Sequence, residues 1–345
     1  MRRSLLMVVA LMILCAGVGI VAHPSIARAE GCDGIVDGNG CLYGLPADVY
    51  NGLYGVMQAN PAPPVESIGV SNDELSRWSF WKIAKEEVTL YDGPDGNPLE
   101  TVKPGFAFVL AHNKTENWIE IEPGKWIAKT DLAVSRPSAY TGVILPGGLP
   151  LQMAWITRPV RPSLTPGAKA DASLPVLRQY TRVYIYHAVM VGNWEWYLIG
   201  PGQWVQQLNV GRVNIIAPPG VGGRWVAIDL YEQVMVAYEG GTPVFATLVS
   251  SGLRSFSTRE GLFKVWAKLP TDAMSGLMGQ PQQYSIPRVP YVMYFDGDIA
   301  LHGAFWHNSF GGQKSRGCVN LSVGDAKWLY NFIGEGTPVY VFRSR

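Results

Sequence analysis

The chain has 345 residues, with 28 lysines and arginines against 27 aspartates and glutamates, so its formal net charge is +1. A charge this close to zero argues against nucleic acid as a partner and against electrostatic attachment to a membrane surface. The length predicts two or three domains.

The N-terminus reads as an export signal. Arg2 and Arg3 precede an uninterrupted apolar run over residues 5–14, and residues 27–29 have the small-x-small pattern of a signal peptidase site. We predict that residues 1–29 are a signal peptide, so the mature protein lies outside the cytoplasm, in the cell envelope or periplasm, or is secreted. An uncleaved membrane anchor is the alternative. Cleavage would remove three arginines and no acid, which changes the net charge from +1 to −2.

Residues 30–75 are predicted to be a disulfide loop followed by a proline-rich linker. Cys32 and Cys41 flank a Gly- and Asp-rich octet, and a disulfide is the default for such a pair in an exported chain. Closing so small a loop stabilises the fold by at most about 2.5–3 kcal/mol. The alternative is a metal site, which no cluster of histidines or further thiols supports. We therefore expect no metal and no cofactor.

The middle of the chain contains an internal repeat. Residues 117–127 recur without a gap as residues 195–205, each as a strand, a Pro-Gly turn and a second strand that opens on tryptophan. Short Val-, Ile-, Tyr- and Trp-rich runs bounded by glycine and proline predict a mainly β protein. Residues 76–135 and 136–215 are interpreted as two small barrels that resemble bacterial SH3-like modules. Their tryptophans either bind the cell wall or fill barrel cores in spacer modules, and core filling is the favoured reading.

Residues 222–344 are predicted to be a third, C-terminal domain. Three short strands over residues 225–249 form a meander, and a helix begins at Ser322, where Asp325 three positions later completes a capping-box pattern. Glycines end the helix, and a last strand covers residues 337–342. Cys318 has no partner once Cys32 and Cys41 are paired. An unpaired thiol outside the cytoplasm is either a nucleophile or an inert core residue.

The residues around Cys318 resemble the catalytic motif of the L,D-transpeptidases, which cross-link bacterial peptidoglycan. In that family a histidine is followed after about fifteen residues by Ser/Thr-His-Gly-Cys-x-Asn or -Arg, and this chain has His302, Ser315, Gly317, Cys318 and Asn320 in that order. The resemblance covers residues 224–343, about a third of the chain, and implies a β-sandwich catalytic domain with one short helix after the cysteine.

The sequence departs from the family motif at two places. Arg316 stands where the family usually has histidine, and residues 258–261 are Thr-Arg-Glu-Gly where Thr-Pro-x-Gly is usual. A guanidinium cannot act as a base, but it can lower the pKa of a nearby thiol or hold a carboxylate.

The resemblance also implies roles for individual residues. Cys318 is the nucleophile, His302 is the general base and acid, and an ion pair between them favours the thiolate. The backbone carbonyl of Gly303 orients His302, and the N–H groups of Gly317 and Cys318 bind the oxyanion. The expected substrate-binding residues are Ser315, Arg316, Asn320, Trp306, His307 and Tyr294. The alternative for His307 is a position on the surface. The alternative for Trp306 and Tyr294 is a place in the core.

The implied reaction transfers an acyl group between two peptidoglycan stem peptides, the donor and the acceptor, and makes a 3→3 cross-link. Water as acceptor would give an L,D-carboxypeptidase, and an inactive wall-binding protein is a second alternative. The resemblance further implies covalent capture of carbapenems at Cys318. We expect a monomer.

Overall fold

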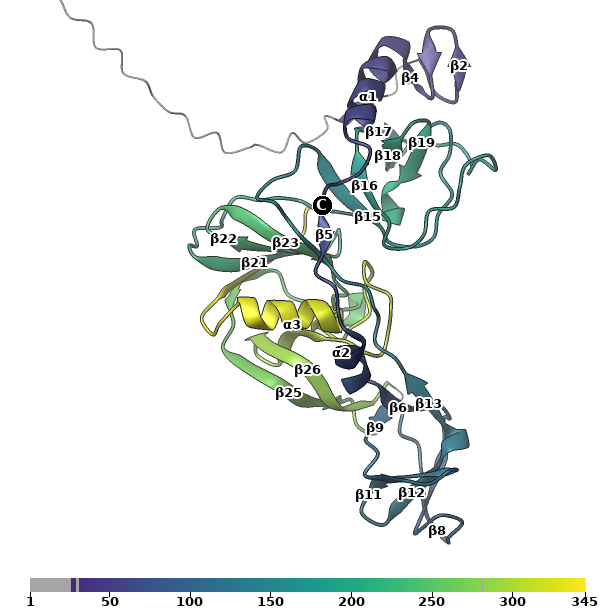
Figure 1. Cartoon of the computed structure of the whole chain (residues 1–345), viewed down its shortest axis with the longest axis vertical. Helices are drawn as coiled ribbons and strands as arrows, with labels where there is room; N and C mark the ends of the chain where they lie inside the picture. Colours follow the sequence, from purple (N-terminus) through teal and green to yellow (C-terminus); the bar gives the residue numbers. More distant parts are fainter. Residues whose placement is uncertain (1–25, 29–30, 281) are drawn as a thin grey trace, which may run out of the picture.

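The computed structural model describes residues 26–28, 31–280 and 282–345. The protein is mainly β, as predicted, and consists of a C-terminal domain with a smaller β module on either side (Figure 1). No helix within the described residues is both long and apolar enough to span a membrane. Most of the predicted signal peptide lies outside the described residues, so its cleavage stays a prediction. Ile26–Arg28 forms β1, which pairs in parallel with β17 (His187–Val191).

The C-terminal domain is built from two sheets and one helix. The first sheet has the order β24-β29-β21-β22-β23-β14-β5, and the second contains β25, β26, β27 and β28. Its elements are β21 (Arg224–Asp229), β22 (Val234–Glu239), β23 (Thr242–Leu248), β24 (Gly261–Lys264), β25 (Ala267–Gly276), β26 (Tyr284–Asp296), β27 (Ile299–Gly303), β28 (Val319–Leu321), α3 (Val323–Phe332) and β29 (Pro338–Phe342). Buried residues of both sheets and of α3 share one core. The predicted meander, helix and last strand are all present.

Two segments from the N-terminal half also belong to this domain. β14 (Val143–Ile144) pairs with β23, and β5 (Glu66–Ser67) pairs with β14 at the sheet edge. The predicted ranges 30–75 and 136–215 therefore differ from the structure, because each includes a strand of the C-terminal sheet. The difference has a physical reason: two-residue strands carry no periodicity that a sequence can reveal.

Module 1, residues 80–135, folds as two small sheets around an apolar core. Its elements are β6 (Phe80–Ile83), β7 (Val88–Tyr91), β8 (Pro98–Val102), β9 (Phe106–Val109), β10 (Asn113–Lys114), β11 (Trp118–Glu122), β12 (Lys125–Ala128), a 3-10 turn (Lys129–Asp131) and β13 (Leu132–Ser135). The short helix α2 (Asn72–Arg77) precedes it. Glu74 of α2 accepts hydrogen bonds from Trp78 and Tyr291 and pairs with Lys327 of α3. The start of module 1 is therefore fixed to the C-terminal domain.

Module 2, residues 152–212, repeats the hairpin of module 1. Its elements are β15 (Gln152–Ile156), β16 (Arg182–Ile185), β17, β18 (Trp194–Gly200), β19 (Gln203–Gln206), a 3-10 turn (Gln207–Asn209) and β20 (Val210–Arg212). The repeat extends to detail: each hairpin has a register shift before the Pro-Gly turn, and each is followed by a 3-10 turn and a strand. Ile119 and Ile127 of module 1 and Trp204 of module 2 are fully buried. The repeat tryptophans themselves differ: Trp204 is buried, whereas Trp118, Trp126 and Trp196 are half-buried, so core filling holds for one of the four.

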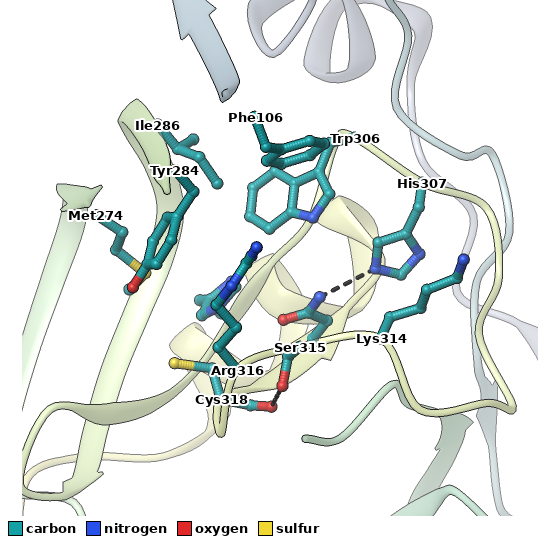
Figure 2. Close-up of a pocket in the computed structure, with 12 residues that line it drawn as sticks. Phe106, Met274, Tyr284, Ile286, Trp306, His307, Lys314, Ser315, Arg316 and Cys318 are labelled. Carbon is teal, nitrogen blue, oxygen red and sulfur yellow. Dashed lines mark hydrogen bonds between the residues drawn. The ribbon is translucent and has the colours of Figure 1, made fainter. Parts of the chain in front are cut away.

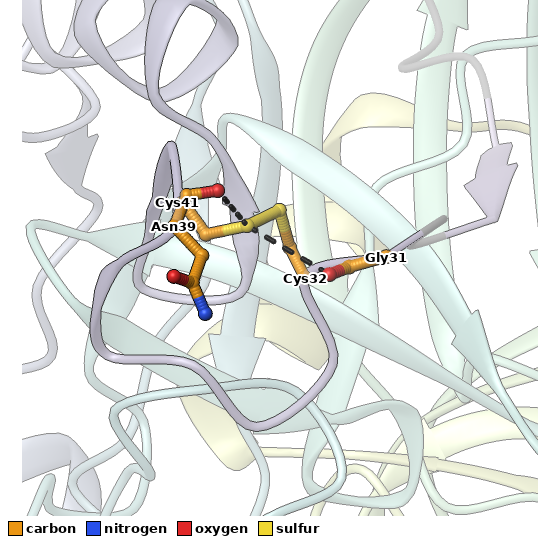
Figure 3. The surroundings of a disulfide bond; sticks show 4 residues. All are labelled: Gly31, Cys32, Asn39 and Cys41. Atoms are coloured by element: carbon orange, nitrogen blue, oxygen red, sulfur yellow. Dashed lines mark hydrogen bonds between the residues drawn. A yellow bond between two sulfur atoms is a disulfide. The ribbon is translucent and has the colours of Figure 1, made fainter.

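The N-terminal segment packs on module 2 and is not a free loop with a linker. The predicted disulfide between Cys32 and Cys41 is present (Figure 3). β2 (Asp37–Gly38) lies within the loop that it closes, and β3 (Cys41–Leu42) begins at the second cysteine. With β4 (Leu45–Pro46) these strands form a small sheet, and the helix α1 (Ala47–Ala59) follows. Tyr50 and Met57 of α1 share a core with Trp204 of module 2. The sequence interpretation missed this helix, because two glycines interrupt its pattern and its buried face has only these two residues.

A buried carboxyl group joins the segment between modules 1 and 2 to the C-terminal domain. Asp325, in the first turn of α3, accepts hydrogen bonds from the Gly142 N–H at 2.7 Å and from the Thr247 hydroxyl at 2.6 Å. The Ser322 hydroxyl caps α3 by accepting from the Asp325 N–H at 3.1 Å, as the capping pattern predicted. The Asp325 carboxyl group thus links α3 to the segment around Gly142 and to β23. Burial raises the pKa of this carboxyl to about 7.

Replacing Asp325 tests this connection. We expect Asp325→Ala to lower the free energy of unfolding by about 1–3 kcal/mol, because it leaves the buried Gly142 N–H without its partner and removes one acceptor of the Thr247 hydroxyl. Chemical denaturation measures the change. Asp325→Asn is the matched control, since it keeps an acceptor and a similar shape.

The difference in stability between the wild type and Asp325→Asn should also depend on pH. The folded pKa lies above the unfolded value of 3.8, so the contribution of Asp325 to stability is complete below about pH 4 and is lost as the pH rises to about 7. The stability of the wild type relative to Asp325→Asn should therefore fall across this window and stay constant above it. A difference that is independent of pH would contradict the raised pKa.

Candidate active site

His302 and Cys318 lie on neighbouring parallel strands. His302 is in β27 and Cys318 directly precedes β28, with Leu301 opposite Val319 and His302 opposite Asn320 in the register. Both open into a groove of about 310 Å³. The lining residues, shown in Figure 2, are Phe106, Met274, Tyr284, Ile286, His302, Trp306, His307, Lys314, Ser315, Arg316, Cys318 and Asn320.

The loop before Cys318 is held by internal hydrogen bonds. Gly317 has a φ of +114°, and a Cβ there would lie 2.5 Å from Ile299 Cδ1, so only glycine fits. The Ser315 hydroxyl accepts from the Gly317 N–H at 3.2 Å and donates to the Cys318 carbonyl. The Thr258 hydroxyl donates to the Gly317 carbonyl at 2.7 Å.

These bonds change two expected roles. The Gly317 N–H is directed at Ser315 Oγ, so in this structure it does not face the groove as an oxyanion donor. Ser315 was expected to bind substrate, but both hydrogen bonds of its hydroxyl hold the loop itself. Ser315 is therefore a positioning residue for Cys318.

His302 is oriented by the neighbouring carbonyl. Its Nδ1 lies 3.1 Å from the Gly303 oxygen, so Nδ1 carries the proton and Nε2 is left as the basic nitrogen. This is the arrangement that the family resemblance implied. The His302 ring is 2% exposed and packs on Trp306, with ring centroids 5.7 Å apart.

Burial keeps both reacting groups neutral in this structure. It lowers the pKa of His302 to about 4, against a smaller opposing effect of the Gly303 carbonyl. Burial also raises the pKa of the Cys318 thiol to about 11, and the charge of Asp298 adds to this. These two shifts do not favour the ion pair that the family resemblance implied. The pair is a thiol and a neutral imidazole, and proton transfer must accompany attack on the substrate.

His307 belongs to the site and determines how Asn320 is oriented. The Ser309 N–H donates to His307 Nδ1 at 3.2 Å, so the neutral ring carries its proton on Nε2, which lies 3.0 Å from Asn320 Nδ2. Two donors cannot bond, so the Asn320 amide oxygen must face His307 and the NH₂ group must take the position of Oδ1. That position is buried and has no partner among the described residues. Asn320 therefore supplies a hydrogen-bond donor inside the site.

Arg316 holds one wall of the groove in this structure. Its guanidinium donates to the Gln282 carbonyl at 2.8 Å and lies 4.8 Å from the centre of the Tyr284 ring. Both residues belong to the tip of the β25–β26 hairpin, which forms that wall. Arg316 thus joins the cysteine loop to the hairpin, whereas the sequence had suggested contact with substrate alone.

The two expected aromatic residues differ in their positions. Trp306 lines the groove, as expected. Tyr294 does not: its ring stacks on Trp266 with centroids 5.4 Å apart, and its hydroxyl donates to Asp272 at 2.8 Å. Tyr294 lies towards the C-terminal end of β26, whereas Tyr284 and Ile286, which line the groove, lie at its start.

The sequence interpretation missed five lining residues: Phe106, Met274, Tyr284, Ile286 and Lys314. Tyr284 and Ile286 alternate on β26, a signal that the prolines at positions 287 and 290 cut short. Lys314 stands directly before the motif and could have been included. For Phe106 no sequence signal exists, since it comes from module 1.

The raised thiol pKa predicts how Cys318 reacts with iodoacetamide. The thiolate is the reactive form, so the alkylation rate should rise about tenfold per pH unit between pH 7 and 9, without a plateau. Peptide-resolved mass spectrometry measures the rate at Cys318. His302→Ala should give the same profile, because no ion pair is lost. A plateau below pH 8 that disappears in His302→Ala would show that the ion pair exists.

Comparisons with known proteins agree with this geometry. Residues 223–341 match the family model of the L,D-transpeptidase catalytic domain. No curated protein matches the chain.

Among solved structures, an L,D-transpeptidase from Mycobacterium smegmatis is 23% identical over 45% of this chain and 69% of its own length, with a TM-score of 0.34. One from Stackebrandtia nassauensis is 28% identical over 37% of this chain and 60% of its own length, with a TM-score of 0.31. The catalytic domain of an E. faecium L,D-transpeptidase acylated by ertapenem is 30% identical over 35% of this chain and 98% of its own length, with a TM-score of 0.32. With TM-scores this low, the assignment rests on the sequence match: residues 223–341 are a catalytic domain of the L,D-transpeptidase family.

Proposed function

We propose that the protein is a peptidoglycan L,D-transpeptidase that uses Cys318 as its nucleophile. The observation that carries the proposal is the single groove into which the thiol of Cys318, the oriented imidazole of His302 and the amide of Asn320 all open. This set supplies a nucleophile, a base and a donor, which are the parts that acyl transfer needs.

The first half of the reaction forms a thioester. The Cys318 sulfur attacks the carbonyl carbon of the third residue of a stem tetrapeptide while His302 Nε2 takes the thiol proton. The carbonyl oxygen gains negative charge, which the Cys318 N–H stabilises. The C–N bond to D-alanine then breaks, and the leaving amine takes the proton from His302.

The second half releases the acyl group to an amine. The side-chain amine of an acceptor stem attacks the thioester and gives a proton to His302, the C–S bond breaks, and the thiol is reprotonated. The product is a 3→3 cross-link. If water attacks instead, the product is a tripeptide and the enzyme is an L,D-carboxypeptidase. Turnover on either route depends on the same nucleophile.

The charge of the groove suits an acidic ligand. Its lining includes Lys314 and Arg316, and the twelve described lining residues contain no aspartate or glutamate. Stem peptides carry free carboxylates, which these cations would attract. We propose that the donor stem binds here outside the cytoplasm, where the predicted signal peptide would deliver the protein.

Removal of the nucleophile tests the proposed function. The mature protein should convert a purified disaccharide-tetrapeptide into a dimer with loss of D-alanine, and Cys318→Ala should give neither dimer nor tripeptide, as followed by mass spectrometry. Tripeptide alone from the wild type would indicate a carboxypeptidase. Near-wild-type turnover by Cys318→Ala would refute the proposal, and an inactive wild type would favour the wall-binding alternative.

Carbapenem capture provides an independent test of the thiol. Because the E. faecium catalytic domain was acylated by ertapenem, we expect ertapenem to add to Cys318, with its β-lactam C–N bond opening as the thioester forms. Intact-mass spectrometry should show one adduct on the wild type and none on Cys318→Ala. An adduct on both proteins, or on neither, would contradict this prediction.

A further inference from the structure

Module 1 and the catalytic domain share a continuous β-sheet. β9 of module 1 pairs in parallel with the start of β26, with Phe106 opposite Tyr284 and Ala107 opposite Ser285. The Phe106 N–H donates to the Gln283 carbonyl at 3.0 Å, and the Gln283 side-chain amide donates to the Lys103 carbonyl. The tip of the groove-forming hairpin is thus held by module 1 on one side and by Arg316 on the other.

The two parts also share a core behind the catalytic histidine. Phe80 and Phe108 of module 1 contact Phe305, with ring centroids 4.6 and 5.1 Å apart. Phe108 lies 6.4 Å from the ring of Trp306, and Trp306 in turn packs on His302. Module 1 therefore supports the residue that covers the catalytic imidazole, which a spacer module would not do.

One side chain of module 1 lines the groove itself. Phe106 is half-buried and lies beside Trp306 and Ile286, at the end of the groove away from the Cys318 sulfur (Figure 2). These residues make this end apolar, whereas His307 and Lys314 lie on another side.

From these contacts we infer that module 1 is part of the catalytic unit and that Phe106 is a specificity-determining residue. Its ring contacts the apolar portion of the stem peptide bound at Cys318, and the β9–β26 pairing fixes the hairpin that faces it. The inference rests on the proposed function for the identity of the ligand. The docking of module 1 does not depend on that function and can be tested without any turnover.

Two glycines of module 1 provide a matched pair of variants for the docking. Gly105 has a φ of +66°, and a Cβ there would lie 2.6 Å from the Gln283 carbonyl oxygen. Gly124 has a φ of +74°, and a Cβ there would meet nothing within 4 Å. Both alanine variants have similar backbone strain, but only Gly105→Ala also forces module 1 and the hairpin apart.

Hydrogen exchange of the mature protein measures this separation. In Gly105→Ala, amides of residues 284–289 and 106–109 should exchange at least about tenfold faster than in Gly124→Ala, which should match the wild type. Equal exchange in the two variants would show that the modules do not dock in this way.

Binding of a disaccharide-tetrapeptide to protein that also carries Cys318→Ala tests the role of Phe106. Phe106→Ala should raise the Kd about tenfold through loss of apolar contact, and Phe106→Leu should restore most of the affinity. In the active protein Phe106→Ala should raise KM, with kcat and the rate of Cys318 alkylation by iodoacetamide little changed. An unchanged Kd would overturn the assignment of Phe106.

The outcomes separate this inference from the proposed function. If Cys318→Ala protein binds no stem peptide at all, the proposed substrate is wrong and the assigned ligand of Phe106 falls with it. The exchange difference between Gly105→Ala and Gly124→Ala would still show whether module 1 holds the hairpin.

Discussion

The parallel pairing of β27 with β28 is the constraint on which the site depends. It brings together a histidine and a cysteine that a long loop separates in the chain, and it does so with fully buried neighbours, Leu301 and Val319, on the core side. A parallel ladder fixes the register, and a slip of one residue would turn His302 away from the groove. The loop between the strands is then free to supply Trp306, His307 and Arg316 to the walls.

Burial of this pair has a chemical consequence. Removal from water lowers the pKa of His302 and raises that of Cys318, which favours the neutral form of both groups. A neutral thiol is less reactive than a thiolate towards oxidants and alkylating agents, which suits an unpaired cysteine. Charge then develops only in the presence of substrate, where the fixed N–H groups of the site can stabilise it.

Strands and contacts that the modules share with the C-terminal domain explain why the chain is not a string of independent modules. β5 and β14 complete the C-terminal sheet, and the buried carboxyl group of Asp325 binds the segment that leads from one module to the other. Module 1 then extends the second sheet through β9. The catalytic domain thus lies between the two modules (Figure 1).

The sequence by itself determined the features that depend on local chemistry. The motif around Cys318 carried the family, the capping residues placed α3, the cysteine spacing predicted the disulfide, and the Pro-Gly repeat predicted the paired hairpins. These signals are local because turns, caps and small loops are decided by neighbouring residues. Tertiary structure decided what depends on distant contacts: the first part of β26, which its prolines hide, the internal use of the Gly317 N–H and of Ser315, the contacts of Tyr294 with Trp266 and Asp272, and the position of Phe106. Whether a side chain binds a ligand or its own fold depends on which distant residue comes to face it, and no spacing along the chain encodes that.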